Sequence, residues 1–189
     1  PAPAAGRVLY VVYAGHGLPG RVLLEPTVAT EAALTGRELR AALAELEARD
    51  VSLRTFLFVD ACRSQSLFDE RGAGGPGPDF AAALEAADAR AASVRLGVLT
   101  AATSGQPAGE IRSLGAGYFS HVLASGLAGA ADADGDALVS FGELAAFVAW
   151  NTRKLTGQMP WFEPPGGNLA AVTMDLRGER RLLVAAGGP

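Results

Sequence analysis

A histidine and the only cysteine of the chain each follow closely on a continuous apolar run. The run at residues 8–14 ends two residues before His16, and the run at 56–59 ends shortly before Cys62. A run that is apolar at every position favours a parallel strand covered on both faces. Because ligand sites in open parallel sheets lie beyond the carboxyl ends of the strands, His16 and Cys62 would reach one crevice if both runs lie in one sheet. A cysteine nucleophile with a histidine base requires this arrangement.

Each of the two residues also has a structural interpretation when it is considered alone. A lone cysteine after an apolar run is most often inert and buried, because a free cysteine packs as a small hydrophobic side chain. His16 alone could be a structural histidine, but the glycines on both sides allow a tight turn and a close approach to a ligand. The presence of both motifs favours the nucleophile.

The two motifs together resemble the catalytic dyad of the caspase-like superfamily, especially that of bacterial caspase homologues and metacaspases. The caspase signature is Gln-Ala-Cys-Arg/Gln/Gly-Gly with its histidine about 50 residues upstream, and the chain keeps the spacing, the Ala-Cys pair and Arg63. It differs in having Asp60 in place of glutamine and Ser64 in place of glycine. The first difference resembles the Asp-x-Cys motif of metacaspases. The resemblance extends, with gaps, from Arg7 to about Phe162.

The resemblance implies an α/β fold, a caspase-like three-layer sandwich with a mostly parallel central sheet. Alternating strand and helix patterns favour the same class. Two strands and two helices that such a fold places before the histidine strand are missing, and residues 1–6 are linker-like. We expect the chain to need this upstream segment, either cut away or supplied as a separate chain, because a parallel sheet opened at its middle exposes an apolar edge. The catalytic domain would span 7–165, with a C-terminal strand pair or extension at 166–189.

The chemistry that the dyad implies is acyl transfer. His16 would keep Cys62 as the thiolate that attacks a scissile carbonyl, and would then donate a proton to the leaving amine. The tetrahedral oxyanion needs two donors, and the backbone N–H groups of Gly17 and Cys62 are the natural pair. No third residue that orients the histidine can be identified from the sequence, and no cofactor is expected for catalysis.

Two further residues are candidates for substrate binding. Asp60 lies two residues before Cys62, so on a strand it points to the same face, and Ser104 stands in the polar stretch after the apolar run at 96–102. As the metacaspase resemblance implies, Asp60 would form the floor of a pocket for arginine or lysine, and it would repel the aspartate that caspases prefer. In the alternative interpretation, Asp60 is a buried acid that pairs with an arginine or caps a backbone group.

An acidic stretch at residues 132–143 matches the calcium loop of an EF-hand. Such a loop places oxygen ligands at positions 1, 3, 5, 7 and 12. These positions hold Asp132, Asp134, Asp136, the backbone carbonyl of Leu138, and Glu143. The departure is Ala137, which replaces the glycine of the sharp turn at position 6 and would be strained there. The stretch is therefore either a calcium site or a metal-free loop that joins two helices.

The segment at 65–80 is rich in glycine and proline, and long loops in compact domains are usually functional or disordered. In caspase relatives the segment after the nucleophile strand is a linker that is cut on activation. Here it carries Arg71 followed by Gly72, so a peptidase with a pocket for basic residues could cut after Arg71. A surface loop in which the arginine has no role is the alternative.

Weaker patterns complete the expected organisation. Thr35 and Glu38 predict a capping box that opens a helix at 36–48, with Leu43 and Leu46 on its apolar face. Helices are also expected at 81–92, 118–127 and 141–155, a strand at 96–102, a turn-rich stretch at 158–165, and a terminal strand pair at 168–176 and 180–185.

Composition narrows the class of protein. The chain has 189 residues, 49% of them hydrophobic, and a formal net charge of -4, so it can bury a core and has no basic stripe for nucleic acid. No apolar stretch reaches the ~20 residues of a membrane span, and no signal peptide opens the chain. One cysteine excludes an internal disulfide. We expect a cytoplasmic domain without nucleic-acid or membrane partners.

The sequence favours a cysteine endopeptidase that cleaves a protein or peptide substrate after arginine or lysine, with calcium modulation and self-processing as further expectations. A catalytically silent caspase homologue that serves as an adaptor or scaffold is the main alternative, although it would not need both His16 and Cys62. A calcium-responsive interaction module, which binds metal without turnover, is the third hypothesis.

Overall fold

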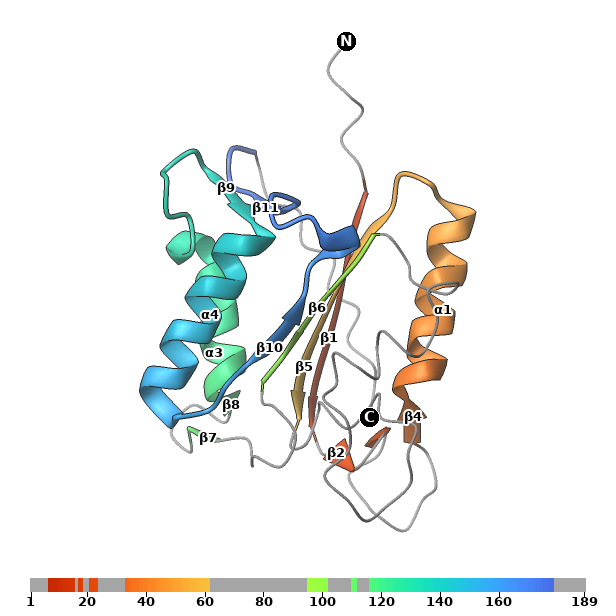
Figure 1. Ribbon diagram of the computed structural model, residues 1–189, viewed down its shortest axis with the longest axis horizontal. Helices are drawn as coiled ribbons and strands as arrows, with labels where there is room; N and C mark the ends of the chain where they lie inside the picture. The colour runs from red at the N-terminus through yellow and green to blue at the C-terminus, as the bar shows by residue number, and fades with distance from the viewer. Residues whose placement is uncertain are drawn as a thin grey trace.

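The computed structural model describes residues 7–15, 17–18, 21–23, 33–61, 95–101, 110–111 and 116–178. Within these residues the chain forms three layers, with a central sheet between helices on both faces (Figure 1). Helix α1 (Gly36–Arg49) covers one face, and helices α3 (Tyr118–Ser125) and α4 (Phe141–Thr156) cover the other. The described part of the chain thus confirms the expected layered α/β architecture.

The central sheet is mostly parallel, as expected. Its four strands are β1 (Val8–Gly15), β5 (Arg54–Ala61), β6 (Leu96–Thr100) and β10 (Trp161–Glu163), in the order β1-β5-β6-β10. β1, β5 and β6 are parallel to one another, and β10 runs antiparallel to β6. β10 lies in the stretch that the sequence predicts to be turn-rich. The sequence pattern does not indicate this strand, because three residues are too few to show alternation.

Strand β5 forms the centre of the core. Every residue after Arg54 in this strand is buried, in agreement with its apolar pattern. Alternate side chains enter two hydrophobic clusters, because successive residues of a strand point to opposite faces. Phe56 and Phe58 pack in the cluster under α3 and α4, whereas Leu57 and Val59 pack in the cluster under α1.

Among the described strands β1 is the outermost of the central sheet, and it is partly exposed although its apolar run predicts a strand covered on both faces. Val12 is 61% exposed and Val8 is 38% exposed. Among the described residues, no strand pairs with the outer edge of β1.

Helix α1 begins with the predicted capping box. The Thr35 hydroxyl accepts a hydrogen bond from the N–H of Glu38 at 3.2 Å, and the Glu38 carboxylate accepts one from the N–H of Thr35 at 2.9 Å. The helix buries Leu43 and Glu47, whereas Leu46 is exposed. The buried Glu47 is therefore an acid on a face that the sequence pattern assigns to apolar residues.

Arg95 closes the other end of α1. Its guanidinium donates to the carbonyl oxygens of Glu47, Asp50 and Val51, and carbonyls at the C-terminus of a helix attract a cation. The Glu47 carboxylate lies 3.9 Å from the same guanidinium. Burial raises the pKa of Glu47, and the charge of Arg95 offsets part of that rise.

A two-stranded sheet formed by β9 (Leu138–Ser140) and β11 (Val172–Asp175) lies at the top of the molecule in Figure 1. β11 falls within the first half of the predicted terminal strand pair, and among the described residues it pairs with β9. The second half, residues 180–185, lies outside the described residues.

The same small sheet is attached to the amino-terminal halves of the central strands. The Tyr10 hydroxyl donates to the carbonyl of Thr173, and the Arg54 guanidinium donates to the carbonyl of Val172 at 2.9 Å. The Tyr10 ring also stacks on Phe56, with 6.0 Å between the ring centroids. β9 and the acidic stretch before it are thereby placed at the end of the sheet where β1 and β5 begin.

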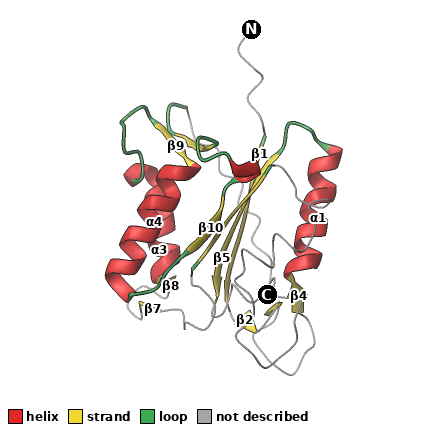
Figure 2. Cartoon of the chain, viewed as in Figure 1, coloured by secondary structure: helices red, strands yellow, loops and turns green. Residues whose placement is uncertain are grey.

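Shorter elements complete the described chain. They are β2 (Gly17–Leu18), β3 (Arg21–Leu23), β4 (Ala33–Thr35), β7 (Glu110–Ile111), β8 (Ala116–Gly117), the π-helical turn η2 (Gly126–Ala130) and the 3-10 turn η3 (Pro165–Gly167). β8 leads directly into α3 at the end of the sheet where β1 and β5 finish (Figure 2). The helix expected at 81–92 lies outside the described residues. None of the helices in the described ranges has the length and apolarity needed to cross a membrane.

Replacing Glu47 by glutamine should stabilise the protein at neutral pH. The folded-state pKa of Glu47 is raised. The stability that Glu47 contributes is therefore fully present below the unfolded-state pKa of about 4.3. It is lost as the pH rises through the folded-state pKa. Glutamine does not ionise, so the melting temperature of Glu47→Gln should exceed that of the wild type near neutral pH. The difference should shrink as the pH falls toward the unfolded-state pKa.

Thermal unfolding followed across this pH range measures the effect. Glu45→Gln, at an exposed position of the same helix, is the matched control and should change the melting temperature little. A stabilisation by Glu47→Gln that grows toward acidic pH would contradict the interpretation.

Candidate active site

The carboxyl ends of β1 and β5 lie side by side. In the parallel ladder, Gly15 is the register partner of Ala61. His16 and Cys62 lie outside the described residues, and each follows its strand by one peptide bond. Since consecutive Cα atoms are about 3.8 Å apart, the chain reaches both positions from neighbouring points on one edge of the sheet. The two strands therefore meet the first requirement of the predicted dyad, which is a common edge.

Of the other predicted site residues, only some lie within the described part of the chain. Gly17, a predicted oxyanion donor, begins β2 and pairs with Val22 of β3. Ser104 and Arg71 lie outside the described residues. The roles of His16, Cys62 and these three residues stay predictions.

Asp60 is the substrate-binding candidate whose surroundings the structure describes. It lies near the carboxyl end of β5 and is 8% exposed. Its Oδ2 atom accepts two hydrogen bonds from Ser120 in the first turn of α3. The backbone N–H of Ser120 donates at 3.1 Å and the hydroxyl at 2.5 Å. Both donors therefore converge on one oxygen of the carboxylate.

Asp60 supplies the cap that α3 lacks. The residue before the helix, Gly117, has no side chain to accept a hydrogen bond from the free N–H groups of the first turn. An added Cβ at Gly117 would lie 2.2 Å from Asp60 Oδ2, so the carboxylate occupies the space that a side chain would need. The partial positive charge at the N-terminus of a helix favours a carboxylate in this position.

The contacts of Asp60 bear on the two structural roles that the sequence left open. Capping of a backbone group is observed, through the N–H of Ser120. Within the described part of the chain, no arginine or lysine pairs with Asp60. No donor among the same residues contacts Oδ1. The cap therefore leaves one oxygen of a buried carboxylate uncommitted within the described chain.

Ser120 is the residue near the candidate site that sequence reasoning missed. A signal for it exists, because a glycine directly before a predicted helix cannot accept a hydrogen bond from the first turn, which indicates an acceptor from elsewhere. The sequence does not say which acid supplies that acceptor. Asp60 and Ser120 are 60 residues apart, and their contact depends on how α3 packs on the sheet.

The acidic stretch forms a loop in which the carboxylates converge. One oxygen from each of Asp132, Asp134 and Asp136 lies within 4.8 Å of the others. Asp132 accepts hydrogen bonds from the N–H groups of Gly135 at 2.8 Å and Ala137 at 3.1 Å. Ala137 has a φ of 63°, which is the left-handed conformation that its place in the loop predicts. This set of hard oxygen donors fits a calcium ion.

Glu143, the expected ligand at position 12, accepts hydrogen bonds within the loop. Its carboxylate accepts from the N–H of Ser140 at 2.9 Å, from the hydroxyl of Ser140 at 2.7 Å and from the N–H of Ala133 at 3.0 Å. The N–H of Ser140 contributes most to lowering the pKa of Glu143. A calcium ion would compete with this capping box for the same oxygens.

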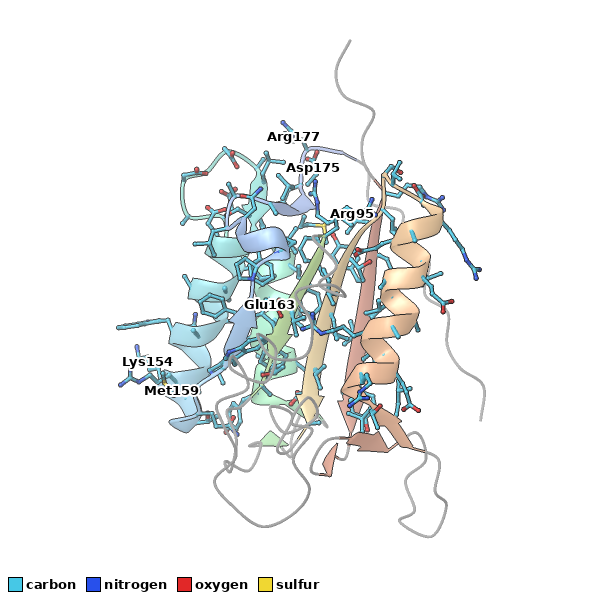
Figure 3. All side chains as sticks on the ribbon, turned by 45° about the vertical axis from the view of Figure 1, so that its right-hand side comes forward. Arg95, Lys154, Met159, Glu163, Asp175 and Arg177 are labelled. Atoms are coloured by element: carbon cyan, nitrogen blue, oxygen red, sulfur yellow. The ribbon has the colours of Figure 1, made fainter. Side chains whose placement is uncertain are left out.

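The positively charged side chain of Arg177 lies beside the acidic loop. The Arg177 guanidinium donates to both carboxylate oxygens of Asp175, at 2.9 and 2.8 Å, and Figure 3 shows the two residues close together at the top of the molecule. Hydrogen bonds from Arg177 lower the pKa of Asp175 to about 2. Hydrogen bonding to Asp175 raises the pKa of Arg177, and the charge of Asp136 adds to the rise. Arg177 is thus held by Asp175 at a position where it also interacts with the charge of Asp136.

The acidic loop and Asp60 lie at opposite ends of the sheet. The loop leads into β9 at the top of Figure 1, whereas Asp60 contacts the first turn of α3 at the bottom. Strand β5 is eight residues long, so its two ends are separated by about 25 Å. A metal ion in the loop would therefore not contact the edge that precedes His16 and Cys62.

Comparison of the sequence with protein-family models and with curated protein sequences gives no match. Among solved structures, caspase-1 from Spodoptera frugiperda is similar, with a TM-score of 0.56 and 13% sequence identity, over 92% of this chain and 65% of that chain. At this identity the likeness shows the fold alone. The chain has a caspase-like fold, and it spans 65% of the length of that caspase. The metacaspase branch stays a prediction.

Replacing Ala137 by glycine should stabilise the acidic loop. A residue with a Cβ in the left-handed conformation is less stable than glycine by roughly 1 kcal/mol, and the greater freedom of glycine in the unfolded chain offsets part of this gain. Ala137→Gly should therefore raise the free energy of unfolding by up to about 1 kcal/mol. If the loop binds calcium, the variant should also gain more thermal stability from calcium than the wild type.

Thermal unfolding in calcium and in chelator measures both effects. Ala133→Gly lies in the same loop but not at a positive φ, so it should be neutral or destabilising. Melting temperatures that do not respond to calcium in any variant would identify the stretch as a metal-free loop.

Proposed function

We propose that the protein is a cysteine endopeptidase with a Cys62–His16 dyad. The observation that carries the proposal is the register of β1 and β5, in which Gly15 pairs with Ala61 at one edge of the sheet. The residues that come next in the chain are the two reactive ones. The caspase-like fold supports the same chemistry, because its parallel pairing of β1 with β5 ends both strands at one edge of the sheet.

The proposed reaction follows from the chemistry of the two side chains. His16 accepts the thiol proton of Cys62, and the thiolate attacks the carbonyl carbon of the scissile bond. The N–H groups of Gly17 and Cys62 stabilise the oxyanion. His16 then donates its proton to the leaving amine as the C–N bond breaks, which leaves a thioester on Cys62. Water, deprotonated by His16, hydrolyses the thioester and regenerates the thiol.

The specificity that we propose is cleavage after arginine or lysine. Asp60 supports it, because a buried carboxylate is unfavourable unless it is hydrogen-bonded or paired with a cation. The described residues provide hydrogen bonds from Ser120 but no cation. A basic side chain of the substrate would complete the pairing, whereas an acidic one would be repelled. Ser104 remains a proposed member of the same pocket, because it stands in the polar stretch after the apolar run at 96–102.

Calcium at 132–143 is proposed to act on stability and not on the chemical step. The separation of about 25 Å along β5 argues against a direct contact with the dyad. The loop is instead continuous with α4, whose capping box shares Glu143 with the proposed ligand set. Binding would therefore adjust the start of α4 and the β9–β11 sheet.

The proposed partners are a protein or peptide substrate and the upstream segment of the same fold. The exposed side chains of Val8 and Val12 support the second partner. A strand added along β1 would satisfy the edge and shield these side chains from water.

The main competing proposal is a silent caspase homologue that serves as an adaptor. Treatment with an arginyl chloromethyl ketone separates the two, because a thiolate beside a histidine in a pocket for basic side chains is alkylated, whereas an inert buried cysteine is not. A calcium-responsive interaction module would bind calcium and show no turnover. Peptide-library cleavage with and without calcium tests that third possibility.

Cys62→Ala should abolish peptidase activity without unfolding the protein. The sulfur is needed for the covalent step, so kcat/KM on an arginyl peptide should fall by roughly a thousandfold or more. His16→Ala should be nearly as inactive, because the thiolate loses its partner and the leaving group its acid. Circular dichroism verifies the fold of both variants, and retained turnover in Cys62→Ala would contradict the mechanism.

Asp60→Asn should reduce cleavage after arginine and lysine through a higher KM. The substitution keeps the size of the side chain and removes its charge, and the loss of one charge-assisted hydrogen bond corresponds to roughly ten- to a hundredfold. Steady-state kinetics on paired arginyl and lysyl peptides measure it. Asp50→Asn, at the opposite end of the sheet, is the control. Unchanged basic specificity in Asp60→Asn, or a wild-type preference for aspartate, would refute the assignment.

Self-processing is proposed at the bond between Arg71 and Gly72. The active protein should yield a new N-terminus at Gly72 that is absent from Cys62→Ala, because a pocket for basic residues accepts Arg71 in the same chain or in a neighbouring copy. Mass spectrometry of intact and digested protein detects this terminus. Full activity with an uncut 65–80 segment would show that activation does not depend on the linker.

A further inference from the structure

The two oxygens of the Asp60 carboxylate have different surroundings. An ionised carboxylate offers about four acceptor positions, two on each oxygen. Ser120 fills both positions of Oδ2 with its N–H at 3.1 Å and its hydroxyl at 2.5 Å. Among the described residues no donor contacts Oδ1. The carboxylate is therefore asymmetric before any substrate is present.

Packing keeps the carboxylate in place, and the hydrogen bonds from Ser120 make its two oxygens unequal. Asp60 is 8% exposed. Its Oδ2 atom lies so close to Gly117 that a Cβ added there would be only 2.2 Å away. The carboxylate is thus inserted between β5 and the first turn of α3. Rotation that brought both oxygens toward a ligand would break the contacts with Ser120 and leave its N–H without an acceptor at a helix terminus.

We propose that Ser120 is a specificity-determining residue of the candidate active site, because it holds Oδ2 of Asp60 and leaves Oδ1 as the acceptor for the basic side chain of the substrate. Ser120 acts through Asp60 and is therefore a positioning residue. The inference rests on the proposed function, in which Asp60 forms the floor of the pocket for arginine or lysine.

A single available oxygen affects arginine and lysine differently. The guanidinium of arginine gains most from a carboxylate when two parallel N–H groups meet two oxygens. The ammonium of lysine is a compact charge that is satisfied by one oxygen. Holding Oδ2 thus removes the bidentate advantage of arginine and lets the pocket accept lysine on nearly equal terms.

The substitution Ser120→Ala tests this inference. Alanine keeps the backbone N–H bond and removes the hydroxyl, which frees one acceptor position on Oδ2 for a second N–H of arginine. The ratio of kcat/KM for an arginyl peptide to that for the matched lysyl peptide should rise by roughly three- to tenfold. The change should lie in KM, because the contact is remote from the scissile bond. Ser120→Thr restores a hydroxyl and should return the ratio to the wild-type value.

The controls separate a specificity role from a structural one. Ser125→Ala, at an exposed position at the end of the same helix, should leave the ratio unchanged. A thermal unfolding cycle of Asp60→Asn, Ser120→Ala and the double variant should show coupling, and this readout does not require activity.

Each outcome is decisive. A ratio that rises in Ser120→Ala and returns in Ser120→Thr supports the inference. A ratio that stays constant, with both substrates unaffected or equally impaired, overturns it and leaves the Cys62-dependent peptidase standing. Absence of coupling in the unfolding cycle also overturns it. A wild-type protein that cleaves after neither basic residue would instead overturn the proposed specificity, and the inference with it.

Discussion

The parallel pairing of β1 with β5 is the contact on which the rest of the arrangement depends. β5 is buried because α1 packs on one face of the sheet and α3 with α4 on the other, and β1 is aligned to β5 along its whole length. This register determines which residues lead out of the sheet at a common edge. It also determines the face that Asp60 occupies. A slip of one residue along β5 would turn Asp60 to the α1 face and away from Ser120.

Helices α3 and α4, which cover the face of the sheet opposite α1, begin at opposite ends of the molecule. An acidic side chain caps the N-terminus of each. In α4 the acid is local, because Glu143 and Ser140 form a capping box inside the acidic loop. In α3 the acid comes from the sheet, because Asp60 reaches Ser120 from β5. The acidic loop is therefore joined to the core through local chain geometry, whereas the candidate active site is joined to it through tertiary packing.

The features that sequence reasoning identified are those with local causes. The buried run of β5, the Thr35–Glu38 capping box and the left-handed Ala137 each follow from neighbouring residues. The features that it missed depend on distant contacts. These include the strand β10, the pairing of β11 with β9, and the contact of Asp60 with Ser120.

Gly117, at the start of α3, constrains which side chain β5 can carry at position 60. Because Gly117 has no side chain, the Asp60 carboxylate can lie beside its backbone. A Cβ at position 117 would be only 2.2 Å from Oδ2 of Asp60. Positions 60 and 117 are therefore not free to diverge independently: a homologous chain that carries a side chain at 117 must give up the acid at 60 or repack α3. Glycine at 117 beside an acid at 60 would thus act as a paired signature in an alignment, and its loss would mark chains in which the first turn of α3 is capped in another way.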